Sequence, residues 1–459
     1  MTGARGAPYR GWPAVVGLVV LALLLVSLLL TDPDAGDVDA EEEGRGAGAR
    51  AGAPGPEPER RKKPPKRKAG GEGGGAAPAP SISVKEGTPK VGAATPVSHR
   101  LKVHIYDDLP AELVKGFLGN AECRADYTGI EVELPSLIAT SSVYVADGEK
   151  ADYYLVPVMS ECQLMTSLHA GTDFFEAEKA LNAAFEQALD SLQSRFPYWS
   201  RAEGRDHIFV FPSERGVDAL NEENLLRIKK SVVLTGVNQE QEHYFSFWKD
   251  LVVPPLRRAP RPQIPLEADP STKGRDIWLH FRGKLPGHED GSGWGIRQDM
   301  KEVLQGQHGV LFEQAIEQCD RACMFQELVR SQFCLILPEV EGWSLRLYDA
   351  IALGCVPVVV KDSITLPYET FIDYADFLVK IPEGKKADIV EIVQQISSEK
   401  LREMQKALKR VAPAFQWPAV GEFKRNDAFD YLIRELFLKL RFMRNSPYRY
   451  WLEPAANGR

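Results

Sequence analysis

Charged and hydroxyl side chains gather in one short stretch of the chain, and their types suit the recognition of a nucleotide. The stretch contains Glu341, Ser344, Arg346 and Asp349. A guanidinium can donate paired hydrogen bonds to a phosphate, and a carboxylate can accept hydrogen bonds from ribose hydroxyls. Arg346 and Asp349 also have the spacing of an ion pair on a solvated helix face, which is the alternative interpretation. We predict that the four residues bind a nucleotide.

The segments around this stretch predict the structure that would position it. Residues 333–337 and 356–360 are short apolar runs, typical of buried strands. Between them, Ser344 can cap a helix that ends near residue 353, and Gly354 suits the left-handed position that follows. Strand, helix and strand in so few residues predict a βαβ unit with two parallel strands. Ligands of such sheets bind beyond the carboxyl ends of the strands, where Arg346 would lie.

Residues of this βαβ segment also match, in order, a motif of a known family. They are Ser331, Phe333, Cys334, Leu335, Pro338, Gly342, Ser344, Arg346, Asp349, Ala350, Ile351, Gly354, Cys355, Pro357 and Val358. The segment resembles the nucleotide-sugar segment of the exostosin family of glycosyltransferases. In the first half of the chain, Cys123, Tyr127, Glu131, Leu134 and Ser141 recur at spacings similar to those of the same family.

The resemblance implies an α/β fold with two Rossmann-like domains that face each other across a cleft, the GT-B arrangement. It also implies an inverting transferase that moves a sugar from a nucleotide-sugar donor, a UDP-sugar, to a polysaccharide or glycoprotein glycan. A glycan-binding or scaffold protein that kept the fold without catalysis is the alternative. Retention of Ser344, Arg346 and Asp349 disfavours that alternative. The donor sugar and the acceptor are left open, as is assembly with itself or with related transferases.

Two further arginines are candidates for the donor phosphates. Residues 276–281 predict a strand that runs into Arg282 and Gly283, and a glycine after a strand lets the backbone approach a phosphate. Arg297 lies at the start of a predicted helix. By resemblance to the family, Arg282 and Arg297 would contact the donor diphosphate. A plain surface arginine is an equally good interpretation of each.

The catalytic base is sought in the first domain, because inversion needs a group that takes the proton of the acceptor hydroxyl. Asp152 and Glu161 flank the predicted strand that ends at Val156 and Pro157, and both are candidates. The alternative for Asp152 is a turn cap or an ion pair. No Asp-x-Asp motif lies in an apolar setting, so a metal site is not predicted, although the question of a divalent metal ion stays open.

The N-terminal residues predict a membrane anchor followed by a stem. Residues 14–30 are apolar and would span roughly 26 Å as a helix, which is just enough for a bilayer. Arg5 and Arg10 precede them and acidic residues follow, which predicts residues 1–13 as a cytoplasmic tail and the rest of the chain as luminal, a type II topology. With the resemblance to the exostosin family, we expect a Golgi membrane protein with a luminal catalytic part. A cleaved signal peptide is the alternative. Residues 31–98 are rich in Gly, Ala, Pro and charge, which predicts a disordered stem.

The globular part divides by composition. Residues 99–257 alternate strand and helix patterns and predict one α/β domain; residues 258–272 are rich in Pro and predict a linker. Residues 273–459 predict a second α/β domain, with one helix over residues 387–410. The resemblance implies that the first is the acceptor domain and the second the donor domain. A second helix over residues 427–440 could cross back to the first domain.

Charge and cysteine content limit the other classes of partner. The formal net charge is -8, which argues against nucleic acid. Six cysteines in a chain of this length do not make a disulfide scaffold. We expect Cys334 and Cys355 to be buried free thiols, whereas Cys123 and Cys162 could form a bridge. Cys319 and Cys323 lack further ligands nearby, so a zinc site is not expected.

Overall fold

The computed structural model describes residues 100–106, 109, 123, 129–213, 215–236, 245–256, 274–283, 294–314, 319–337, 344–362 and 364–445. The predicted tail, anchor, stem and linker lie outside these residues, and so does Glu341. Within the described ranges, no helix is both long enough and apolar enough to cross a membrane.

The first sheet is entirely parallel, with its strands in the order β1-β2-β3-β4-β5. The strands are β1 (Val103–Ile105), β2 (Tyr153–Leu155), β3 (His207–Phe211), β4 (Val232–Thr235) and β5 (Leu251–Val252). On the outer side of β1, the Val103 amide donates to the Val143 carbonyl at 2.8 Å, and the Val145 amide donates to the Val103 carbonyl at 3.0 Å. Since this short segment follows β1 in the chain and lies opposite β2, the strand order reverses between β1 and β2.

The second sheet is also parallel, in the order β7-β6-β8-β9-β10, so its strand order reverses between β6 and β8. The strands are β6 (Ile277–Gly283), β7 (Val310–Gln314), β8 (Ser331–Ile336), β9 (Val356–Val360) and β10 (Val379–Ile381). The predicted βαβ unit is confirmed, because β8 and β9 are adjacent and Gly354 has a φ of 70°. The α/β fold with parallel sheets is therefore confirmed.

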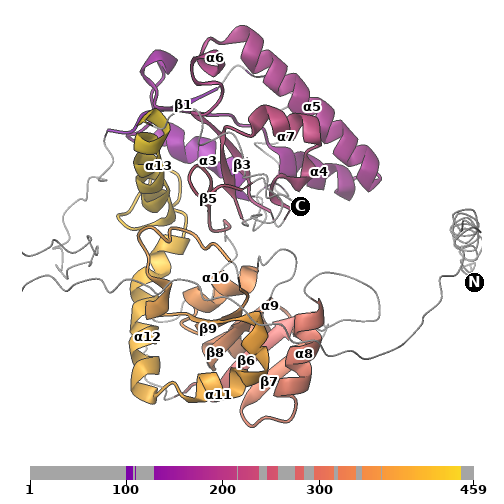
Figure 1. Cartoon of the computed structure of the whole chain (residues 1–459), viewed down its shortest axis with the longest axis vertical. Coiled ribbons are helices and arrows are strands. Elements are labelled where there is room, and N and C mark those ends of the chain that lie inside the picture. Colours follow the sequence, from indigo (N-terminus) through magenta and orange to yellow (C-terminus); the bar gives the residue numbers. More distant parts are fainter. Residues whose placement is uncertain are drawn as a thin grey trace, which may run out of the picture. The chain divides into compact units, whose positions relative to one another are not determined.

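Helices lie between most of the consecutive strands of the described chain (Figure 1). Those around the first sheet are α3 (Gly129–Thr140), α4 (Ser160–His169), α5 (Phe174–Arg195), α6 (Tyr198–Ala202) and α7 (Glu222–Ile228). Those that follow are α8 (Trp294–Leu304), α9 (Arg321–Val329), α10 (Leu345–Ala352), α11 (Ile389–Gln394), α12 (Ser398–Val411) and α13 (Ala428–Asn445). The prediction of one helix over residues 387–410 is wrong. Ser397 caps α12 by accepting the Lys400 amide at 3.1 Å, and this cap separates α12 from α11.

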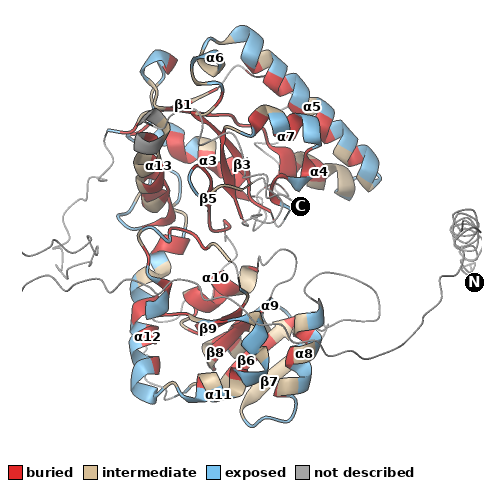
Figure 2. Cartoon of the chain, in the orientation of Figure 1, coloured by how far each residue is buried: buried red, intermediate tan, exposed pale blue. Residues whose placement is uncertain are grey.

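The strands are largely buried, and the long helices α5 and α12 are buried on one side and exposed on the other (Figure 2). On α5, the buried residues Phe185, Leu189 and Leu192 pack with the β3 residues Phe209 and Phe211. Their spacing follows the helical repeat, as the sequence predicts. Helix α13 also contacts the first sheet, because the Tyr153 hydroxyl donates to the Leu436 carbonyl at 3.1 Å. The predicted return of the last helix to the first domain agrees with this contact.

All six cysteines are paired, in the bridges Cys123–Cys162, Cys319–Cys323 and Cys334–Cys355. The expectation of free thiols at Cys334 and Cys355 is wrong. Strands β8 and β9 pair with Phe333 opposite Val356, which brings the Cα atoms of the following and preceding cysteines to 5.8 Å. That separation is within the range of a disulfide. The bridge thus depends on the register between two strands rather than on a local motif.

Three buried polar side chains of the first domain are joined by hydrogen bonds. His207 Nδ1 lies 2.8 Å from Asp206 Oδ1, and His207 Nε2 lies 2.7 Å from the Tyr106 hydroxyl. The network assigns a neutral ring that donates from Nδ1 to the carboxylate and accepts from the tyrosine. Burial lowers the pKa of His207 below its ordinary value of 6.5. His207 is therefore a packed core residue.

We expect His207 to make folding stability depend on pH. Because its folded pKa lies below 6.5, the unfolded chain binds a proton more readily. The free energy of unfolding should therefore fall as the pH drops below 6.5, by up to about 1.4 kcal/mol per pH unit. His207→Gln should reduce this slope by about the contribution of one proton. Urea unfolding between about pH 5 and pH 7 measures the slope. The exposed His308→Gln is the control, and a wild-type slope in His207→Gln would refute the assignment.

Candidate functional site

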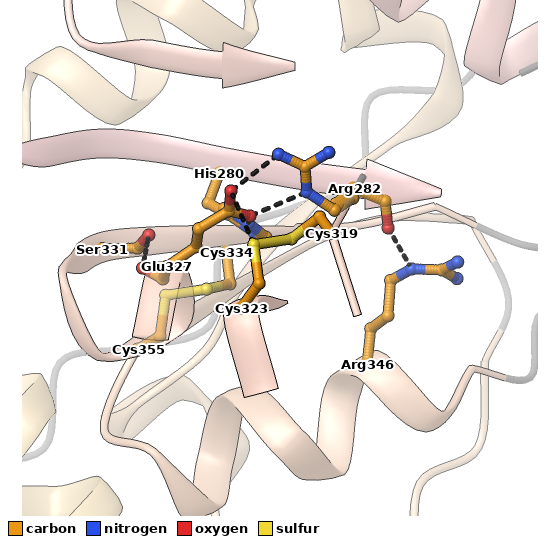
Figure 3. A network of polar contacts seen from close by, with 9 residues as sticks. All are labelled: His280, Arg282, Cys319, Cys323, Glu327, Ser331, Cys334, Arg346 and Cys355. Atoms are coloured by element: carbon orange, nitrogen blue, oxygen red, sulfur yellow. Dashed lines mark hydrogen bonds and ion pairs between the residues drawn. A yellow bond between two sulfur atoms is a disulfide. The ribbon is translucent and has the colours of Figure 1, made fainter. Parts of the chain in front are cut away.

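Arg346 stands at the carboxyl edge of the second sheet, on the first turn of α10 (Figure 3). Ser344 caps this helix and accepts the Arg346 amide at 3.3 Å. Arg346 Nε donates to the Arg282 carbonyl at 2.7 Å, and Nη1 donates to Ser344 Oγ at 3.4 Å. The guanidinium is therefore held between the end of β6 and the start of α10. The strand order reverses between β6 and β8, the strand that precedes α10, and open α/β sheets bind ligands at such a point.

Gly283 makes room for this guanidinium. A Cβ atom built on Gly283 would lie 2.8 Å from Arg346 Nη2 and 3.0 Å from the Phe281 ring. The first contact is shorter than van der Waals packing allows. From the sequence, Gly283 is expected to let the backbone approach a phosphate. In the structure, the absence of a side chain at Gly283 leaves room for the Arg346 guanidinium.

Arg297 also lies close to the ring of Phe281. Its guanidinium carbon is 5.8 Å from the ring centroid, and that of Arg346 is 5.6 Å from the same centroid. Arg297 is only 1% exposed, so the surface interpretation of this residue is wrong. Both cations can be attracted by the ring face. Helix α8 and helix α10 thus each direct an arginine toward the aromatic residue near the end of β6.

Arg282 has a different environment from the one that the sequence suggests. Its Nε and Nη2 donate to Glu327 at 2.8 and 2.6 Å, and His280 Nε2 lies 3.0 Å from the same carboxylate. The hydrogen bonds to Glu327 raise the pKa of Arg282. Burial raises the pKa of Glu327, but hydrogen bonds from Arg282 and His280 outweigh it and bring that pKa below its ordinary value. Sequence reasoning missed Glu327, because nothing local marks an acid on α9 as a partner of β6.

Asp349 is 2% exposed on α10, and its carbonyl accepts the Leu353 amide at 2.9 Å within the helix. The structure therefore brings together Arg282, Arg297, Ser344 and Arg346 around the end of β6, with Asp349 one turn along α10. Their predicted contact with a donor stays a prediction.

The two candidate bases lie at opposite edges of the first sheet. Asp152 immediately precedes β2, and its Oδ2 accepts the Lys102 amide at 2.8 Å. Glu161 follows β2 on the first turn of α4. Because ligands of parallel sheets bind at the carboxyl edge, the geometry favours Glu161. The Asp152 carboxylate instead accepts a backbone amide that is 50 residues away in the chain.

Glu161 belongs to a buried cluster that the sequence does not predict. Ser213, which follows β3, donates its hydroxyl to Glu161 Oε1. Glu131 on α3 accepts the Glu161 amide at 3.2 Å and the Cys162 amide at 3.1 Å. Glu131 and Glu161 are each 2% exposed. Burial, followed by the charge of Glu161, raises the pKa of Glu131 well above its ordinary value. The two buried carboxyls are therefore electrostatically coupled, and burial disfavours the charged form of Glu131.

Comparison with known proteins decides the family. The exostosin GT47 domain matches residues 97–396, which is more than half of the chain. The chain belongs to the exostosin GT47 family. It is similar to a probable glucuronoxylan glucuronosyltransferase of Arabidopsis thaliana, with 26% identity over 74% of this chain and 73% of that one. It is also similar to a probable beta-1,4-xylosyltransferase of the same plant, with 27% identity over 74% of this chain and 82% of that one.

This exostosin-family chain is a glycosyltransferase, as the relatives indicate. Among solved structures it resembles sucrose-phosphate synthase from Thermosynechococcus elongatus, at 13% identity over 74% of this chain and 100% of that one. The TM-score is 0.35.

One group of metal-type ligands occurs in the described part of this glycosyltransferase. Cys319, Cys323 and Glu327 have ligand atoms within 4.8 Å of one another. Both sulfurs are joined in a disulfide, so neither is a thiolate that could bind a metal ion. These residues do not fit a metal site in this oxidised form.

Proposed function

We propose that the chain is an inverting glycosyltransferase that moves a sugar from a UDP-sugar to a glycan of a polysaccharide or glycoprotein. The observation that carries this proposal is the position of Arg346 at the helix start beyond β6 and β8. The positive end of the helix dipole and a guanidinium together favour a diphosphate. Family membership, with relatives named as glucuronosyl- and xylosyltransferases, supports it.

In the proposed reaction, Arg346 and Arg297 neutralise the diphosphate, and Asp349 accepts hydrogen bonds from the ribose hydroxyls. The acceptor hydroxyl attacks the anomeric carbon while the bond from that carbon to the diphosphate oxygen breaks. UDP leaves with the electron pair of that bond, and its growing charge is stabilised by the arginines. Glu161 takes the proton of the acceptor hydroxyl. The GT-B arrangement would bring the two sites together across a cleft.

We further propose that the protein is anchored in the Golgi membrane by residues 14–30, with its catalytic part in the lumen. Three disulfides support an oxidising compartment, because thiols of cytosolic proteins are usually kept reduced. Protease treatment of sealed Golgi vesicles tests the proposal. Digestion of the globular part in unbroken vesicles would contradict it.

The function itself is tested by a donor screen. The full-length protein should bind UDP and should release UDP from one nucleotide sugar when an acceptor glycan is present. We expect UDP-glucuronate or UDP-xylose to be the best donor, because the relatives are named for these sugars. Glucose and galactose donors are the comparison set. Folded protein that neither binds UDP nor releases it from any donor would refute the proposal.

A further inference from the structure

The side chain of Glu327 on α9 accepts hydrogen bonds from two residues of β6, His280 and Arg282 (Figure 3). Its two oxygens accept from Arg282 Nε at 2.8 Å, from Arg282 Nη2 at 2.6 Å and from His280 Nε2 at 3.0 Å. The side chains of Arg282 and Glu327 are only 10% and 13% exposed, so solvent screens this pair weakly. Burial lowers the pKa of His280 below 6.5, so its ring is mainly neutral at pH 7. The charged groups of this cluster are then Glu327 and Arg282.

Glu327 is also fixed from its own backbone. Its carbonyl accepts the hydroxyl of Ser331 at 2.6 Å, and Ser331 begins β8. One turn earlier on α9, Cys323 forms the bridge to Cys319, and its Sγ lies 3.9 Å from Glu327 Oε1. The carboxylate therefore projects from a turn of helix that is tied at both ends, and a bidentate pair with such an anchor has little freedom.

Arg282, whose side chain is bound by Glu327, also contacts Arg346 through its backbone. The carbonyl of Arg282 accepts Arg346 Nε at 2.7 Å, and the next residue, Gly283, lies against Arg346 Nη2. Any change in the backbone at the end of β6 must therefore move the Arg346 guanidinium. Without Glu327, the buried Arg282 cation would lose its counter-charge, and its side chain would turn toward another anion.

We propose that Glu327 is a positioning residue for the donor diphosphate, which acts through the backbone of Arg282 on Arg346. Arg282 is then the link between the two rather than a phosphate ligand of its own. Glu327 touches neither the substrate nor the reacting atoms. The inference rests on the proposed donor site at Arg346.

The experiment is a double-mutant cycle on the full-length protein, with the Kd of UDP measured by calorimetry. Glu327→Gln keeps the size of the side chain but removes its charge. We expect it to raise the Kd roughly tenfold and to raise the donor KM more than the acceptor KM. In the Arg346→Ala background, the same change should add less than about twofold, because the residue through which it acts is gone. Glu327→Asp keeps the charge and should lie between wild type and Glu327→Gln.

Asp276→Asn is the matched control. It removes a carboxylate from an arginine pair in the same part of the chain, and the side chains of that pair, Arg330 and Asp276, are 55% and 60% exposed. It should leave the Kd unchanged. If Glu327→Gln does not fold, Glu327→Asp or Arg282→Lys can take its place, each measured alone and together with Arg346→Ala.

Three outcomes overturn the inference or its basis. A wild-type Kd in folded Glu327→Gln, with a raised Kd in Arg346→Ala, would refute the role of Glu327 alone. An equal effect of Glu327→Gln on the Kd with and without Arg346 would show that Glu327 affects UDP binding independently of Arg346. An unchanged Kd in Arg346→Ala would refute the proposed donor site.

Discussion

Replacing Glu161 by Gln should lower kcat by about 10²–10⁴-fold, the usual contribution of a general base. Glu161 follows β2 at the edge where parallel sheets bind ligands, and it accepts a hydrogen bond from Ser213. An amide has the same shape but cannot take the proton of the acceptor hydroxyl. The Kd of UDP should stay within about twofold of wild type, because the proposed donor contacts lie on α8 and α10 of the other sheet. Steady-state release of UDP with saturating acceptor measures kcat.

Asp152→Asn is the comparison for this prediction. Asp152 precedes β2 and accepts the Lys102 amide, so an Asn oxygen can replace its contact. We expect Asp152→Asn to keep kcat within about twofold, since the residue stands at the opposite edge of the sheet. A loss of kcat in Asp152→Asn with full activity in Glu161→Gln would give the role of base to Asp152. Full activity in both would exclude the two candidates.

The local structure around Arg346 could be predicted from the sequence, because the signals for it are local. Residues 331–362 carry a strand, a helix cap and a left-handed glycine in direct succession, and each has its own physical cause. Ser344 accepts the amide of Arg346, and Gly354 has the expected positive φ. Capping and helix periodicity act over a few residues, so they can be inferred without knowing what packs on the helix.

The contacts that the sequence did not predict join residues far apart in the chain. Glu327 meets Arg282 because α9 packs beside β6, and Glu131 meets Glu161 because α3 packs against the start of α4. The Cys334–Cys355 bridge likewise depends on strand register. Each pairing follows from topology, which sets the neighbours only after the sheet order is known. Parallel sheets could be expected from the alternation of strands and helices. Which strands are neighbours, and where the order reverses, could not.

Arg346→Ala should raise the Kd of UDP by about 10–100-fold and lower kcat as well. A hydrogen bond to a charged group contributes about 1.5–3 kcal/mol, and each 1.4 kcal/mol changes Kd about tenfold. The loss should be larger in kcat/KM than in Kd, because the charge on the diphosphate grows as the bond to the sugar breaks. Loss of one preorganised donor of this kind typically costs about 10²–10³-fold in kcat. Calorimetry with UDP and initial rates with the donor sugar measure the two effects separately.

The controls separate binding from folding at the same helix. Asp349→Asn should weaken UDP binding at least tenfold, on the same scale of about 1.5–3 kcal/mol, with little change in kcat at saturating donor. Arg330→Ala removes an equal charge from an exposed pair with Asp276 and should change neither quantity, because exposed ion pairs contribute little. The arginine matters through its place, since its Nε is held by the Arg282 carbonyl and its Nη2 fills the space left by Gly283. An unaltered Kd for UDP in folded Arg346→Ala would reduce α10 to a structural helix, and the donor would then have to bind elsewhere.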